Sequence, residues 1–72
     1  GHFNYHIALP EDETLSIEIV NSVGEILYKQ DDIKVHGSYD GEINLRPVNH
    51  GVYILYLRGI KTFLIRKLII NN

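Results

Sequence analysis

The sequence contains four histidines, a residue type that commonly binds metals or transfers protons. His2 and His6 fall in a stretch predicted to be a β-strand, where four strand steps separate them by about 13 Å. That separation is too large for one zinc ion. His36 and His50 fall in separate predicted loops. We therefore expect surface and turn histidines and no metal site.

Acidic residues gather in two segments, 11–13 and 31–32. Oxygen-rich loops can bind calcium, but neither segment has the spaced Asp, Asn and Gly residues of a calcium loop. Paired carboxylates that act as acid and base need a cleft, and so small a domain leaves little room for one. We expect solvated loops that bind neither a metal nor a cofactor.

The serines are Ser16, Ser22 and Ser38, and none of them lies in a nucleophile elbow. Ser22 has the sequence context of a turn, and the sequence contains no glycine-rich phosphate loop. The sequence therefore predicts no catalytic residue and a protein that is not an enzyme.

Tyrosines could form a surface that binds carbohydrate or peptide. Tyr53 and Tyr56 have opposite parity within one predicted strand, so at most one of them faces the core. An exposed Tyr56 or Tyr28 is a candidate for recognition. The alternative is that tyrosine simply suits a half-buried sheet.

Alternation of apolar and polar residues predicts β-strands along most of the chain. Residues 15–19 alternate cleanly, so Leu15, Ile17 and Ile19 are expected to share a buried face. Residues 21–24 have the composition of a hairpin turn, in which Gly24 takes the left-handed conformation. The predicted strands span residues 3–9, 15–19, 25–29, 38–45, 52–57 and 62–70.

Other segments are less regular. Residues 30–37 are predicted to be a connection, or an irregular edge with Ile33 and Val35 buried, and Asp40-Gly41 suggests a bulge or turn. Pro47 places a loop at 46–50, and residues 58–61 form a turn. Both parities are apolar at 52–57, which is typical of a strand that is covered on both sides or lies centrally in a sandwich. A short amphipathic helix is the alternative for 62–71.

Length and composition limit the fold and the partners. The 72 residues suffice for one domain, expected at 3–72, with Gly1 and His2 as a remnant of an expression tag. The absence of cysteine excludes disulfides, and a net charge of −2 makes nucleic acid a poor partner. No signal peptide or membrane span is predicted. About six strands with regularly spaced turns indicate a sandwich or an open barrel.

The last predicted strand would be prone to aggregation if its edge stayed unpaired. Arg66 and Lys67 interrupt its apolar run, as charges that oppose aggregation often do. The strand must therefore be buried between neighbours or pair with another strand. The second case would give a homodimer or strand exchange.

The order of motifs resembles the C-terminal sorting domain of the type IX secretion system of Bacteroidetes, the Por secretion family. The similarity extends over about residues 5–71. Its most specific element is the Gly-Val-Tyr block. The motifs are residues 15–24, Ile26-Leu27, residues 42–45, Gly51-Val52-Tyr53-Ile54-Leu55 and Lys67-Leu68-Ile69-Ile70.

The resemblance implies a small immunoglobulin-like β-sandwich of about six to seven antiparallel strands. It implies a non-catalytic module of a longer exported protein, recognised by an outer-membrane translocon and located extracytoplasmically, in the secreted fraction or at the cell surface. In that family the domain is typically removed, or exchanged for a lipopolysaccharide anchor, after export.

Two groups of residues follow from this resemblance. Lys67 and the neighbouring Arg66 in the last strand are the candidates for recognition by a protein partner, either the secretion machinery or the parent protein. Tyr56, a candidate because it is a tyrosine expected to be exposed, completes the recognition candidates. Gly24, Gly51, Tyr53 and Leu55 are the expected structural motif. The alternative function is a structural or adhesive accessory domain that binds protein or glycan through exposed tyrosines.

Overall fold

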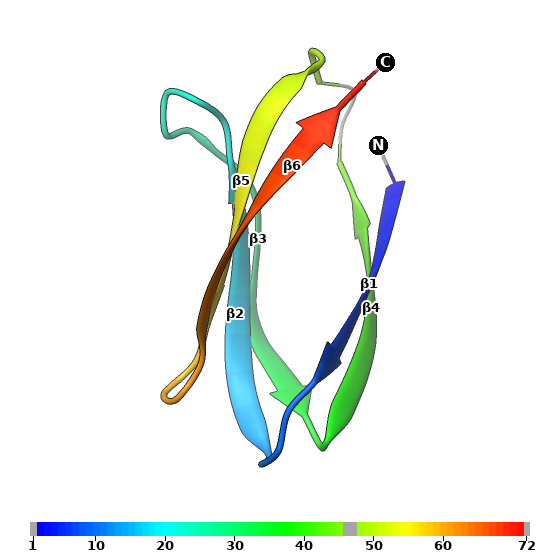
Figure 1. The fold of residues 1–72 in the computed structure, drawn as a ribbon, viewed down its shortest axis with the longest axis vertical. Helices are drawn as coiled ribbons and strands as arrows, with labels where there is room; N and C mark the ends of the chain where they lie inside the picture. Colours follow the sequence, from blue (N-terminus) through cyan, green and yellow to red (C-terminus); the bar gives the residue numbers. More distant parts are fainter. Residues whose placement is uncertain (1, 46–47, 72) are drawn as a thin grey trace.

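The computed structural model describes residues 2–45 and 48–71, which form six antiparallel strands in two sheets (Figure 1). The strands are β1 (His2–Ala8), β2 (Glu13–Val20), β3 (Ile26–Val35), β4 (Ser38–Asn44), β5 (Gly51–Arg58) and β6 (Phe63–Ile70). The predicted all-β class is confirmed, and the arrangement is consistent with a small β-sandwich. The helical alternative for residues 62–71 is wrong, because β6 is a strand. The predicted loop at 46–50 lies partly outside the described residues.

The two sheets differ in size. One contains β1 and β4, and the other has the order β3-β2-β5-β6. Figure 1 shows them as two facing layers, with β1 and β4 together on one side. Within the described part of the chain β6 pairs with β5 alone, so it is an edge strand of the larger sheet, and β5 lies inside that sheet.

The core lies between the two layers and comes from alternate residues of each strand. Leu15, Ile17 and Ile19 on β2 are 1%, 1% and 0% exposed, which confirms their predicted common face. β1 and β4 contribute Ile7 and Ile43 from the opposite layer. The remaining buried residues are Ile33, Val35, Leu45, Tyr53, Leu57 and Ile70. Because the domain is small, this one cluster supplies most of the apolar burial that stabilises it.

β3 is long and irregular. Its register against β2 shifts between Leu15 and Ile17, and again between Ile19 and Val20, and each shift places one extra residue on β3. Asp32 lies at the first shift with φ 57°. A bulge of this kind reverses which parity faces the core. The connection predicted for residues 30–37 is therefore wrong up to Val35, and the alternative of an irregular edge with buried Ile33 and Val35 is confirmed.

The bulge or turn predicted at Asp40-Gly41 is absent, since β1 and β4 pair without a register shift. Gly41 has another role. It lies opposite Tyr5, and a Cβ on Gly41 would overlap the Tyr5 ring. Glycine at this position therefore gives the tyrosine room to lie flat across β4.

Turns end the hairpins where the sequence predicts them. Gly24 has φ 87° in the β2–β3 turn, where its N–H donates to the Asn21 carbonyl at 3.1 Å. The Gly59 N–H donates to the Thr62 carbonyl at 2.7 Å and closes the β5–β6 turn. Both predicted turns are confirmed.

Candidate functional site

The β5–β6 hairpin positions all three recognition candidates. In its register Tyr56 pairs with Ile65, Leu55 with Arg66 and Ile54 with Lys67. Leu55 packs against the core. Because neighbouring residues of a strand point to opposite faces, Arg66 lies on the inner face with Leu55. Tyr56 and Lys67 lie together on the outer face, so the structure separates Arg66 from the other two.

The outer face of this hairpin is unusually apolar. Lys67 pairs with Ile54, and its neighbours on the same face of β6 are Ile65 and Ile69. Four apolar side chains of this face are largely open to solvent, namely Val52 (48% exposed), Phe63 (63%), Ile65 (48%) and Ile69 (65%). We call the surface formed by Val52, Ile54, Tyr56, Phe63, Ile65, Lys67 and Ile69 the outer β5–β6 face. An exposed apolar group of this extent is typical of an interaction surface.

Tyr56 is less available than its neighbours on the outer β5–β6 face. The Arg58 guanidinium lies 5.4 Å from the centre of the Tyr56 ring, in a cation–π arrangement. An oxygen of Glu18 lies 3.7 Å from Arg58, which favours this position of the guanidinium. The ring is therefore already occupied by an intramolecular partner.

Arg66 borders a groove between the two sheets instead. The groove has a volume of about 370 Å³ and a mainly apolar lining. The guanidinium donates one hydrogen bond, from Nη1 to the Ile65 carbonyl at 3.2 Å. Within residues 2–45 and 48–71 no carboxylate pairs with Arg66.

The four structural-motif residues act in turns and packing. Gly51 begins β5 with φ 156°, and Gly24 has its place in the β2–β3 turn. Tyr53 is buried, and its hydroxyl donates to the Asn49 carbonyl at 2.6 Å. Leu55 is half-buried against the core. The tyrosine thus fixes the loop that precedes β5, a contact that the sequence pattern alone does not indicate.

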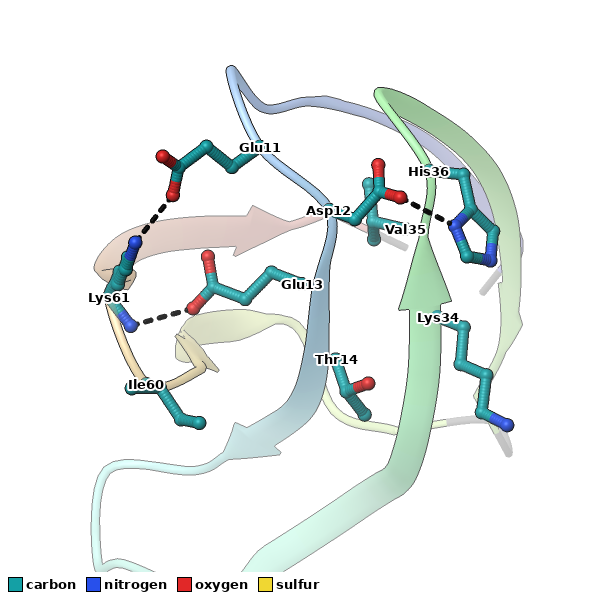
Figure 2. Close-up of a pocket in the computed structure, with 9 residues that line it drawn as sticks. All are labelled: Glu11, Asp12, Glu13, Thr14, Lys34, Val35, His36, Ile60 and Lys61. Atoms are coloured by element: carbon teal, nitrogen blue, oxygen red, sulfur yellow. Dashed lines mark hydrogen bonds and ion pairs between the residues drawn. The ribbon is translucent and has the colours of Figure 1, made fainter.

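The acidic segment 11–13 lies in a shallow pocket at one end of the sandwich (Figure 2). Glu11 pairs with the Lys61 ammonium at 2.5 Å, and Asp12 lies 3.2 Å from Nδ1 of His36. Glu13 belongs to β2 rather than to a loop, which corrects the prediction for that residue. Its carboxylate accepts hydrogen bonds from the Lys61 N–H at 2.8 Å, the Thr62 N–H at 3.1 Å and the Thr62 hydroxyl at 2.7 Å.

These contacts give the acidic residues a structural role. They connect the start of β2 to the β5–β6 turn and to the end of β3. The Thr62 hydroxyl, followed by the Lys61 N–H, lowers the pKa of Glu13 below its ordinary value. In the described part of the chain no three potential ligands come together in a metal-binding group.

The two histidines of β1 also face polar partners, which lie on the neighbouring strand β4. Nδ1 of His2 lies 2.6 Å from the Asn44 side chain, and Nδ1 of His6 lies 2.6 Å from Asp40. Both pairs are exposed and directly opposite in register. They are cross-strand contacts of the smaller sheet.

The described residues form no helix that could cross a membrane. The fold and the candidate residues define the class of the protein. It is a small β-sandwich whose candidate recognition residues lie on the β5–β6 hairpin, at one edge of the larger sheet. Residues 2–71 match the family described as secretion system C-terminal sorting domain, and the chain belongs to that family. No curated protein and no solved structure matches the chain.

Membership confirms the predicted resemblance to the type IX secretion sorting domain. Sorting domains of this type mark proteins for export to the cell surface or the extracellular space, which agrees with the predicted location. The family is one of sorting tails and not of enzymes. The chain thus carries a sorting signal for type IX secretion.

Proposed function

We propose that the secretion translocon recognises the folded sandwich through the outer β5–β6 face, with Lys67 as the central charged contact. The observation that carries this proposal is the position of Lys67 between Ile65 and Ile69 on that face, opposite Ile54. A lysine surrounded by apolar side chains offers a partner one charge to pair and an apolar surface to cover. Such a combination favours a specific protein contact over nonspecific adhesion.

The Lys67 ammonium is available to a partner protein. Among the described residues, the lysine and arginine side chains that form ion pairs are those of Arg58 and Lys61, and the Lys67 ammonium forms none. Burial of the four exposed apolar side chains by a partner would supply favourable free energy, at about 25 cal/mol for each Å² of apolar surface removed from water. The partner should therefore present an apolar surface with a carboxylate.

The adhesive alternative has less support. A tyrosine that binds sugar needs an open ring face, and Arg58 already lies against the Tyr56 ring. Tyr28 donates its hydroxyl to Gln30 at 2.8 Å and packs against the core, so it is not an open surface either. A role as a merely structural accessory domain would leave the exposed apolar residues of β5 and β6 without a partner.

The test compares two substitutions that make the same change in charge. Lys67→Glu lies on β6, and the control Lys34→Glu lies on β3, the opposite edge of the same sheet. Each variant chain is fused behind an exported reporter, and extracellular reporter is measured in a bacterium with type IX secretion. We expect Lys67→Glu to reduce export about tenfold, since it replaces a favourable charge contact with a repulsive one, and Lys34→Glu to leave export unchanged. Equal export of both variants, with folding verified by circular dichroism, would refute recognition through this face.

A further inference from the structure

The two sheets are joined on one side and open on the other. β3 continues into β4 through Gly37, with a bridge between His36 and Ser38. The Leu9 N–H donates to the Gly37 carbonyl at 2.8 Å and fastens the end of β1 to this turn. On the other side lies the groove that Arg66 borders, between β1 of the smaller sheet and the β5–β6 hairpin.

Both strands that flank this groove have an unpaired edge. Among the residues that the structure describes, β1 pairs with β4 alone, and β6 pairs with β5 alone. Such an edge presents a row of backbone N–H and C=O groups that another strand can satisfy. The groove floor is apolar and includes Ile17, Leu55 and Leu57. An added strand would therefore gain backbone hydrogen bonds on its edge and apolar contacts on its inner face.

The charge in the groove specifies the added strand further. Arg66 is the cationic side chain that lines it, between Leu64 and Leu68 on the same face of β6. The described residues supply Arg66 with a backbone carbonyl and no carboxylate. A guanidinium pairs most strongly with a carboxylate, in a bidentate geometry. The complementary strand thus carries apolar side chains at alternate positions and one carboxylate among them.

We propose that this groove is a binding site for an extended segment of a partner protein, which adds to the free edge of β6 and places a carboxylate against Arg66. The inference rests on the proposed function only for the identity of the protein that supplies the segment. It assigns to β6 two recognition surfaces on opposite faces, with Lys67 outside and Arg66 inside.

A second copy of the chain fits this edge poorly. A two-fold antiparallel pairing centred on the middle of β6 places either Arg66 or Lys67 directly opposite the same residue of the copy. Like charges in such positions are destabilising. The charges of β6 therefore disfavour the predicted homodimer and favour an acidic partner strand.

The test uses two blocked peptides in which serine alternates with valine, with one central valine replaced by glutamate in the first and by lysine in the second. Binding to the whole chain is followed through the amide resonances of β6. We expect the glutamate peptide to bind about tenfold more tightly than the lysine peptide, as charge-assisted hydrogen bonds allow. Failure of both peptides to bind, or equal affinities, would overturn the proposal.

Variants of two adjacent residues locate the charge effect. Arg66→Gln should abolish the preference between the peptides, and Arg66→Glu should reverse it. Lys67→Glu, one residue away on the opposite face, should leave the preference unchanged. A preference that follows Lys67 instead of Arg66 would also overturn the proposal. Because the readout is binding in solution, the two proposals can fail separately. Equal export of Lys67→Glu and Lys34→Glu, with the peptide preference intact, would refute recognition through the outer β5–β6 face alone. Reduced export of Lys67→Glu, with no peptide preference in the wild-type chain, would refute the groove alone.

Discussion

Glu13 connects segments that are far apart in the sequence. Its carboxylate accepts hydrogen bonds from Lys61 and Thr62, both in or next to the β5–β6 turn. Gly59 lies beneath it, since a Cβ on Gly59 would overlap the Glu13 side chain. The ionised carboxylate thus holds the tip of the β5–β6 hairpin against the start of β2.

The lowered pKa of Glu13 makes this connection dependent on pH. A carboxylate whose pKa is lower in the folded state stabilises the fold above its unfolded pKa, and this contribution disappears as pH falls through the folded value. We expect Glu13→Gln to lower the midpoint of thermal unfolding at pH 7. The gap between the two proteins should narrow as pH falls from the ordinary pKa of a glutamate through the lower pKa of folded Glu13, because the wild-type carboxylate then takes up a proton. A gap that stays constant from pH 7 to acid would contradict the assignment.

Tyr5 carries a buried hydroxyl that has no hydrogen-bond partner among the described residues. Burial, and the neighbouring Tyr39 and Tyr28, raise its pKa above the ordinary value. A buried polar group without a partner is destabilising, because it loses water and gains nothing in return. The ring still packs across Gly41 and lies 6.1 Å from the Tyr39 ring.

We therefore expect Tyr5→Phe to increase the free energy of unfolding by about 1 kcal/mol, since it removes the hydroxyl and keeps the ring. Chemical denaturation of the two proteins measures the difference. Tyr39→Phe serves as a control for general effects of tyrosine removal in this sheet. A loss of stability in Tyr5→Phe would show that the hydroxyl has a partner.

Alternation predicted the orientation of many residues correctly, because it depends on local geometry. It placed Tyr53 and Tyr56 on opposite faces, and the structure agrees. The partners of Glu13 could not be predicted in this way, since they lie 48 and 49 positions further along the chain. Contacts of this kind follow from the arrangement of strands, which no local pattern encodes.

Among the strands, β3 departs furthest from a regular pattern. The register shift between Gln30 and Ile33 adds one residue to β3, so that Tyr28 and Val35 both pack against the core although they have opposite parity. The consecutive apolar residues Ile26, Leu27 and Tyr28 obscured the alternation in the sequence. The polar residues from Gln30 to Asp32 resemble a connection in the sequence because the bulge interrupts the period of two.

The bulge at Asp32 gives a prediction for this element. Asp32 has φ 57°, in the left-handed region that glycine adopts freely and β-branched residues avoid. We expect Asp32→Gly to be at least as stable as the wild type, and Asp32→Val to lose about 1–2 kcal/mol. Thermal unfolding of both variants measures the order. Equal stability of the valine and glycine variants would show that the bulge is absent or relocates.

At the scale of the whole molecule, the sequence indicated a sandwich but not how the strands divide between the sheets. Nothing local distinguishes a sheet of two strands from one of four. The double-sided apolar pattern of β5 was compatible with cover on both sides or a central position in a sandwich. The structure places β5 inside the larger sheet, with Val52 exposed on the outer face. We therefore expect recognition at the exposed outer face of β5 and at the free edge of β6.

The central claim is that this chain directs export through type IX secretion, and transfer of that property to another protein tests it most directly. The chain is fused to the C-terminus of a reporter that carries a signal peptide, and the fusion is expressed in a type IX-competent bacterium and in the same strain without the translocon. A reporter without the chain is the control. We predict reporter at the cell surface or in the medium of the competent strain alone, and retention inside the outer membrane in the other two cases. Equal release with and without the translocon, or retention in both strains, would contradict the account.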